Sequence, residues 1–329
     1  MSFALARSTF VLVFSALSLS AHGQAASTSS RQAYPAKPVR VVVAFAVGGF
    51  ADSVARLVGV RLSERLGQPV VVDNRGGAGG NIGSRIVAGA APDGYTLLVN
   101  TAAISINTSF YKNPGFDIYR DFVPVALTGS TPGLFAVHAS NSAGTLRDLI
   151  RSAKGKNVTY ATAGVGSSSH LAGDYLLRSL AGLNATHVPF QGGGPATAAA
   201  LANQVDVLSL SMPPVVPHIK AGRLKGLAIS SLTRVAALPD VPTVTEAGFP
   251  GFEERSWVGY FAPAKTPAAI VMKLNAEINP ILGVPDVKSR LDSMGLETKP
   301  GSPEAFAGYL KSEVTKWAKI IKTTGITAN

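Results

Sequence analysis

Residues 39–45 read Val-Arg-Val-Val-Val-Ala-Phe, and the loop that follows, 46–50, reads Ala-Val-Gly-Gly-Phe. Such a continuous β-branched run is typical of a strand in a parallel sheet, which is buried on both faces. Residues 51–66 then carry apolar side chains at helical spacing. A buried strand, a glycine-containing loop and a helix in this order predict the first unit of an α/β fold.

The same unit recurs along most of the chain. Further strands are expected at 70–72, 95–100, 122–127, 133–137, 158–161, 186–190, 205–210, 224–230 and 256–262. Helices are expected between many of them, and this alternation predicts parallel sheets covered on both faces. From residue 267 onward the sequence predicts helices.

The strand–helix rhythm restarts in the middle of the chain, which predicts two lobes. The helical C-terminal segment is assigned to the first lobe, so that this lobe comprises 34–135 and 260–329, and the second comprises 136–259. The chain then crosses between the lobes twice, near 133–140 and 256–263, and we expect these two crossings to form a hinge.

Residues 1–26 have the features of a secretory signal peptide. They carry one basic residue, Arg7, then an almost wholly apolar run over 9–19 and small residues over 20–26. The apolar run is shorter than the roughly 18–20 residues of a membrane-spanning helix, which favours a cleaved signal over an N-terminal membrane anchor. We therefore expect a periplasmic protein that has no stable membrane insertion.

The chain has no cysteine, and its formal net charge is +11. The lack of cysteine excludes disulfides, thiolate metal sites and a cysteine nucleophile, so the core alone must stabilise the exported chain. Lys and Arg residues are scattered, without interleaved aromatic residues, so we expect no nucleic-acid partner. The positive charge can attract anionic ligands or be ordinary surface charge, and the sequence leaves both open.

Four loops rich in glycine and hydroxyl residues follow predicted strands. They are residues 46–50, 100–103, 162–169 and 191–194. In open α/β sheets, ligands bind beyond the carboxyl ends of the strands, where helix N-termini present unpaired N–H groups and partial positive charge. Such loops in both lobes predict a clamp for a carboxylate or a phosphate. The alternative is that each loop is only a tight turn with a serine cap.

Motifs of several common enzyme classes are missing from the sequence. There is no G-x-x-x-x-G-K-[ST] phosphate loop, no G-x-G-x-x-G after a strand and no G-x-S-x-G nucleophile elbow. Ser169 and His170 are neighbours, which suits a helix cap better than a nucleophile and its base. The five histidines lack metal-binding spacing, and Asp52 is interpreted as a helix-dipole partner. We therefore expect no catalytic residue, no metal ligand and no cofactor.

Several ordered sequence blocks resemble those of one family. The blocks are Tyr34-Pro35-x-Lys37-Pro38-Val39-Arg40, Phe45-x-x-Gly48-Gly49-x-x-Asp52, Asn74-Arg75-x-Gly77-Ala78-Gly79-Gly80-Asn81-Ile82-Gly83, Ala91-Pro92-Asp93-Gly94-Tyr95-Thr96-Leu97-Leu98, Ser167-Ser168-Ser169-His170-Leu171-Ala172-Gly173, Pro217-His218-Ile219-Lys220-Ala221-Gly222 and Leu238-Pro239-Asp240-Val241-Pro242-Thr243-Val244-x-Glu246-Ala247-Gly248. With them, essentially the whole chain after the signal resembles the Bug family of extracytoplasmic solute receptors, the binding proteins of tripartite tricarboxylate transporters.

The resemblance implies a type II periplasmic-binding-protein fold, in which two α/β lobes with mixed sheets are joined by a two-strand hinge. It implies a monomer that captures a small carboxylate between the lobes and delivers it to a membrane permease. In the family, backbone N–H groups, hydroxyls and waters hold the carboxylate at loops matching 46–50, Thr101 and 162–169. The alternatives are a ligand-sensing receptor for a membrane signalling protein and a periplasmic enzyme on the same scaffold.

The chain departs from the family pattern at three places. Ala46 and Val47 stand where the family usually has prolines, Phe190 stands where it has tyrosine, and 209–211 replace an aromatic-acidic-amide segment. An apolar Leu210 in the cleft favours a simple or aromatic carboxylate over an amino acid. The complete set of candidate ligand-binding residues is Ala46, Val47, Gly48, Gly49, Phe50, Thr101, Thr162, Gly166, Ser167, Ser168, Phe190, Gln191, Leu210 and Ser211.

Overall fold

Strand β1 (Val39–Val43) lies between two parallel neighbours, β2 (Val70–Asn74) and β3 (Thr96–Thr101), as its β-branched sequence predicts. The computed structural model describes residues 34–326, and the predicted signal peptide lies outside the described residues. Within them, no helix combines the length and the apolar character that crossing a membrane requires.

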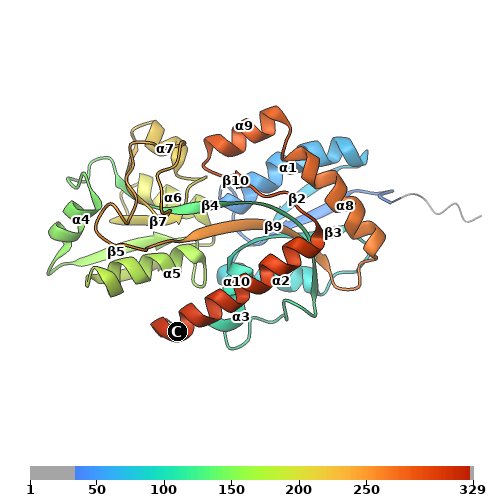
Figure 1. The fold of residues 1–329 in the computed structure, drawn as a ribbon, viewed down its shortest axis with the longest axis horizontal. Coiled ribbons are helices and arrows are strands. Elements are labelled where there is room, and N and C mark those ends of the chain that lie inside the picture. The colour runs from blue at the N-terminus through green and yellow to red at the C-terminus, as the bar shows by residue number, and fades with distance from the viewer. Residues whose placement is uncertain (1–33, 327–329) are drawn as a thin grey trace, which may run out of the picture. The chain divides into compact units, whose positions relative to one another are not determined.

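The sheet continues from β3 through β9 (Arg255–Pro263) to β4 (Phe122–His138), and its strand order is β2-β1-β3-β9-β4-β7-β5-β6 (Figure 1). Strand β9 is antiparallel to both of its neighbours. The sheet is therefore mixed, as the family resemblance implied, whereas strand–helix alternation alone predicted parallel sheets. The reason is topological, since the chain leaves the first half in β4 and returns in β9, so these strands run in opposite directions.

Strand β4 is one strand of 17 residues, where the sequence predicts two, at 122–127 and 133–137. Its first part pairs with β9 up to Pro132, and its last part pairs with other strands from Gly133 onward. The polar residues between the two apolar runs are satisfied inside the sheet, because Thr128 Oγ1 donates to the Val258 carbonyl at 2.8 Å. The apolar pattern did not predict a single strand, because polar residues interrupt it at 128–132. The polar side chains stay inside the strand because they bond to partners that are distant in sequence.

The second half of the chain builds its part of the sheet around the end of β4. Strand β5 (Asn157–Thr162) is parallel to β6 (Asn184–Pro189) and to β7 (Val207–Ser211). Strands β7 and β8 (Leu224–Ile229) pair with β4 in antiparallel fashion, and the short β10 (Glu297–Thr298) pairs with its middle.

Helices follow the strands at most of the expected positions. They are α1 (Phe50–Leu66), α2 (Asn81–Ala88), α3 (Ala103–Phe110), α4 (Leu146–Ala153), α5 (Ser168–Asp174), α6 (Gly193–Leu201), α7 (Val216–Lys220), α8 (Ala268–Ile281), α9 (Pro285–Ser293) and α10 (Pro303–Thr324). A 3-10 turn (Ala78–Gly80) precedes α2, and a π-helix (Tyr175–Leu180) continues α5. Helix α3 was not predicted. The predicted cap of α4 is confirmed, because Thr145 Oγ1 accepts from the Asp148 N–H at 3.1 Å.

Buried apolar side chains form one large and two smaller clusters. The large cluster draws on residues 39–127 and 257–317, with Leu171 added from the other segment. The two smaller clusters draw on residues 134–252. The two-lobe division into 34–135 with 260–329 and 136–259 stays a prediction.

A buried carboxylate joins α10 to the central strand β9. Glu313 Oε2 accepts hydrogen bonds from the indole Nε1 of Trp257 at 3.0 Å and of Trp317 at 3.2 Å. Lys316 Nζ bonds the other oxygen of the same carboxylate. Because Trp257 is fully buried, its N–H has no access to water and depends on this acceptor.

We expect Glu313→Ala to lower the free energy of unfolding by about 2–4 kcal/mol, because two indole donors lose their acceptor. Urea unfolding followed by tryptophan fluorescence measures the change. Glu313→Gln, which keeps an acceptor oxygen, should recover part of the loss, and Glu64→Ala on the exposed face of α1 serves as the control. Equal stability of Glu313→Ala and the control would show that the carboxylate does not stabilise α10 on the sheet.

Candidate ligand-binding site

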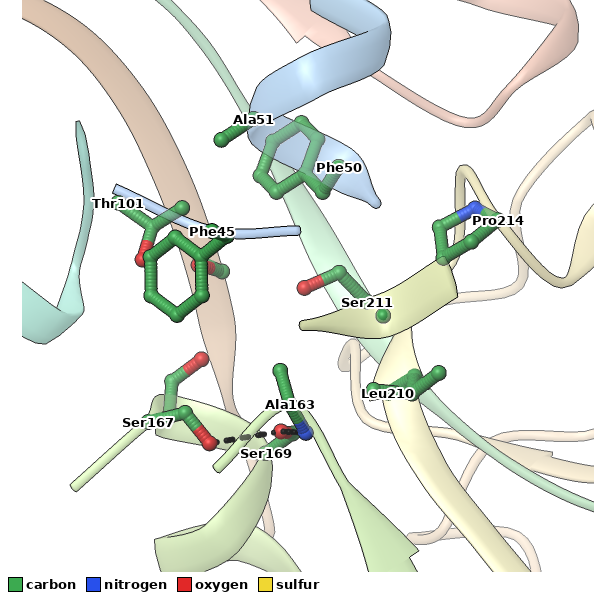
Figure 2. Close-up of a pocket in the computed structure, with 13 residues that line it drawn as sticks. Phe45, Phe50, Ala51, Thr101, Ala163, Ser167, Ser169, Leu210, Ser211 and Pro214 are labelled. Carbon is green, nitrogen blue, oxygen red and sulfur yellow. Dashed lines mark hydrogen bonds between the residues drawn. The ribbon is translucent and has the colours of Figure 1, made fainter. Parts of the chain in front are cut away.

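A cavity lies where the loops after β1, β3 and β5 meet the start of α6 and the end of β7. Residues from both predicted lobes surround it, and Figure 2 shows their side chains. Its lining consists of Phe45, Phe50, Ala51, Thr101, Ala163, Ser167, Ser168, Ser169, Gly193, Leu210, Ser211, Pro214 and Ser256.

The cavity is small, with a volume of about 30 Å³. Since a single water molecule requires about 10–15 Å³ on this measure, the space holds about two waters. Any organic ligand would therefore need the walls to separate. The site in this structure is a closed one.

Two helices direct their N-termini at the cavity. Helix α1 begins at Phe50 after the N-cap Gly49, and α6 begins at Gly193 after the N-cap Gly192. Neither N-cap has a side chain that could occupy the first N–H groups, and residues of both first turns line the cavity. The free N–H groups and the helix dipole make this end of each helix favourable for an anion.

The serines at the start of α5 divide into two roles. Ser167 Oγ donates to the Gly164 carbonyl at 2.7 Å and lies 2.9 Å from Ser169 Oγ, the contact drawn in Figure 2. Ser169 Oγ in turn accepts from the Ala163 N–H at 3.2 Å. All three serines line the cavity, but Ser167 and Ser169 also hold the loop in shape, whereas Ser168 is the first residue of the helix.

No charged side chain occurs among the described residues that line the cavity. The lining combines the hydroxyl residues Thr101, Ser211 and Ser256 with apolar residues such as Phe45 and Leu210. An anion bound here would be held by N–H groups, helix dipoles and hydroxyls, since the lining offers no cation for it to pair with.

Asp52 organises the loop between β1 and α1. Its Oδ2 accepts from the Gly48 N–H at 2.9 Å, and its Oδ1 accepts from Arg56 Nε and Asn74 Nδ2, both at 2.9 Å. Asp52 lies in the first turn of α1, as predicted, and its carboxylate is fully engaged in holding the loop. The Gly48 N–H is therefore already used and is not available to a ligand.

Backbone contacts close the cavity between the two predicted lobes. The Ala46 N–H donates to the Gln191 carbonyl at 2.9 Å. A Cβ added to Gly194 would lie 2.1 Å from the Val47 carbonyl oxygen, and one added to Gly79 would lie 2.2 Å from the Val165 carbonyl oxygen. Glycine is required at these positions because two backbones approach more closely than any side chain permits.

Six of the fourteen residues predicted from the sequence line the cavity: Phe50, Thr101, Ser167, Ser168, Leu210 and Ser211. The other eight, which do not line it, are Ala46, Val47, Gly48, Gly49, Thr162, Gly166, Phe190 and Gln191. Residues 46–49 and Gln191 belong to the closing contact, and Val47 is largely exposed. Thr162 bonds to His187, and Phe190 packs against the core.

Seven lining residues are absent from the predicted set: Phe45, Ala51, Ala163, Ser169, Gly193, Pro214 and Ser256. Ala163, Ser169 and Gly193 belong to loops that the sequence singles out. Phe45 and Ala51 flank the first of these loops. Ser256 carries no local signal, because it reaches the site only through the return of β9 beside β4.

An aromatic stack supports the loop before α5. The rings of His170 and His187 are stacked at 4.0 Å, and Tyr160 stacks on the other face of His187 at 5.1 Å. His187 Nε2 lies 2.7 Å from Thr162 Oγ1. Burial lowers the pKa of His170 to about 4 and that of His187 to about 3, so both imidazoles are neutral at neutral pH. No group of three His, Cys, Asp or Glu side chains able to hold a metal occurs within residues 34–326.

We expect the contribution of His170 and His187 to the free energy of unfolding to be complete above pH 6.5, the ordinary pKa of histidine, and to be lost as the pH drops toward 4. Between pH 6.5 and 4 the histidines of the unfolded chain become protonated, whereas burial keeps His170 and His187 neutral in the folded protein. Urea unfolding at pH 7.5, 6.0 and 4.5 tests this. His187→Gln should lose less stability on acidification than the wild type, and His138→Gln, outside the stack, is the control. Identical pH profiles for the wild type and His187→Gln would contradict the explanation.

Comparison with known proteins identifies the family. The model of the tripartite tricarboxylate transporter family receptor matches residues 54–326. Protein BugT of Bordetella pertussis is 34% identical over 305 residues, which cover 91% of this chain and 93% of BugT.

Two solved structures from Rhodopseudomonas palustris share the fold. One, solved with adipate, is 34% identical, with a TM-score of 0.85 and coverage of 89% of this chain and 99% of that one. The other, MatC with bound malate, is 35% identical, with a TM-score of 0.83 and coverage of 88% and 100%. The expected Bug-type periplasmic-binding-protein fold is confirmed. The chain belongs to the tripartite tricarboxylate transporter receptor family, whose members are periplasmic solute receptors.

Proposed function

We propose that this receptor binds a small carboxylate without an amino group and delivers it to the membrane permease of a tripartite transporter. One observation carries the proposal: the N-termini of α1 and α6 and several hydroxyls converge on a cavity whose described lining has no charged side chain. This supports a receptor function over the alternative of an enzyme on the same scaffold.

The electrostatics of the cavity favour an anion over a cation or a zwitterion. A carboxylate can accept charge-assisted hydrogen bonds from the first N–H groups of both helices and from hydroxyls such as that of Thr101. An α-amino group would need a charged acceptor, and Leu210, Pro214 and Phe45 offer none. The carbon skeleton of an organic acid can instead pack against these apolar groups.

Ligand exchange requires the two lobes to separate. We propose lobes of 34–135 with 260–329 and of 136–259, which separate by bending where β4 and β9 cross between them. The loops 46–49 and 191–194 would then move apart and admit the ligand, and their closure would exclude water from it.

Related proteins support two parts of this proposal: that the ligand is a small carboxylate, and that the receptor acts in the periplasm. Adipate and malate in the two R. palustris structures are both small dicarboxylates. The family name supports a permease partner, and residues 1–26 would direct export to the periplasm. We propose that the receptor acts as a monomer. A receptor that reports its ligand to a membrane signalling protein is the second candidate.

A panel of ligands tests this function on protein that has been unfolded, dialysed and refolded to remove bound solutes. Malate, adipate, citrate, benzoate and glutamate are compared by thermal unfolding and calorimetry. At 100 times its Kd, a ligand stabilises the folded state by about 2.7 kcal/mol, so at least one acid without an amino group should raise the midpoint by about 5 °C. Stabilisation by glutamate alone, or by none of the acids, would refute the proposal.

Gly194→Ala should weaken binding of the stabilising acid at least 10-fold while leaving the ligand-free fold intact. Its Cβ would lie 2.1 Å from the Val47 carbonyl oxygen, so the loops cannot close, whereas alanine suits the helical backbone of α6. Calorimetry gives the affinity, and thermal unfolding without ligand gives the stability. Gly308→Ala on α10, where an added Cβ meets nothing within 4 Å, is the matched control. Unchanged affinity in Gly194→Ala would show that this contact is not needed to retain the ligand.

A further inference from the structure

A buried carboxylate, Glu254, lies where the chain enters β9. Its N–H donates to the Ser230 carbonyl at 3.0 Å, and its own carbonyl accepts from Ser230 Oγ at 2.5 Å and from the Gly133 N–H at 3.4 Å. Strand β4 pairs with β9 up to Pro132, and from Gly133 onward it pairs with β7. The backbone of Glu254 is therefore tied into the proposed hinge.

The side chain of Glu254 is only 6% exposed and points back against β4. A Cβ on Gly133 would lie 2.4 Å from its Oε2, and that oxygen is 3.4 Å from Ser230 Oγ. Its Oε1 is buried without a hydrogen-bond partner among the described residues. Ser168, which lines the ligand cavity, acts on the same carboxyl group, since its hydroxyl lowers the pKa of Glu254. Glu254 thus contacts the proposed hinge strand at Gly133 and is influenced by Ser168, a residue of the cavity lining.

Burial raises the pKa of Glu254, and the groups around its carboxyl lower that pKa by less than burial raises it. The charged groups that act on it, Lys316 and Glu313, come from α10 and bond to each other. The other neighbours carry no charge: Ser168 begins α5, Ser230 follows β8, and Gly133 belongs to β4. Burial raises the pKa of Glu254 to about 7, and the hydrogen bonds from the two serines lower it less than burial raises it.

The protonation state of Glu254 determines what Ser168 can offer a ligand. When ionised, the Glu254 carboxylate only accepts, so it takes the O–H of Ser168 and adds a negative charge beside the cavity. When protonated, it can donate to the Ser168 oxygen, which leaves the serine O–H free to donate to a ligand carboxylate. Both effects favour the protonated form when an anion is bound.

We propose that Glu254 couples carboxylate binding to the uptake of one proton, so that the receptor binds its anion more tightly at acidic than at alkaline pH. The proposal rests on the proposed carboxylate-binding function. The proton comes from solvent and is released when the ligand leaves. His170 and His187 do not compete for this role, because they stay neutral throughout the neutral and alkaline range.

Calorimetric titration with malate and with adipate at pH 6.5, 7.5 and 8.5, where both stay dianions, tests the coupling. We expect wild-type affinity to fall about 10-fold or more across this range. Glu254→Gln carries a permanently neutral amide that can donate to Ser168, so it should bind with nearly constant affinity, close to that of the wild type at pH 6.5. Glu253→Gln, the exposed neighbour, should retain the wild-type pH dependence.

Repeating the wild-type titration in two buffers of different ionisation enthalpy measures proton uptake directly and requires no variant. We expect a net uptake near neutral pH, absent from Glu254→Gln. The coupling is overturned if malate or adipate binds with no pH dependence and no proton uptake. It is also overturned if Glu254→Gln shows the same pH dependence as the wild type. In both cases carboxylate binding itself still stands. If neither acid nor any other member of the panel binds at any pH, the proposed function itself fails.

Discussion

The antiparallel pairing of β4 with β9 is the constraint on which the rest of the structure depends. These strands carry the chain out of the first half and back into it, and they pair from Phe122 with Pro263 to Pro132 with Arg255. Because β4 then pairs with β7 and β8, one sheet continues through both halves. These two strands set the distance between the glycine-rich loops of the two halves, and they form the hinge that we propose.

The proposed binding site follows from this arrangement together with the backbone of its loops. Helices α1 and α6 start from opposite halves, and residues of both first turns line the same cavity. Glycine at 194 and 79 lets the backbones meet, and Asp52 keeps the first loop rigid by bonding the Gly48 N–H. A site built from N–H groups can bind an anion without a buried cation, which would be costly to desolvate in the empty protein.

Some features could be predicted from local sequence because local physics determines them. The β-branched run at 39–45, the Thr145 cap and the glycine and serine loops all depend on backbone preferences within a few residues. Other features depend on partners far away in the chain. The joining of two predicted strands into β4 requires Thr128 to bond with Val258, and Ser256 reaches the cavity only because β9 returns beside β4.

By itself the sequence determined the alternation of strands and helices, the positions of the glycine- and hydroxyl-rich loops, and membership of a receptor family. Only the tertiary structure decided which strands are antiparallel, that residues 46–49 close the cavity without lining it, and that Glu254 is buried beside Gly133 and Ser230. The physical reason is that strand direction, burial and pKa are set by contacts between distant segments. Glu254 lies in a connection that contains several prolines and glycines, and nothing in its neighbouring sequence indicates that its carboxylate is buried with one oxygen lacking a hydrogen-bond partner among the described residues.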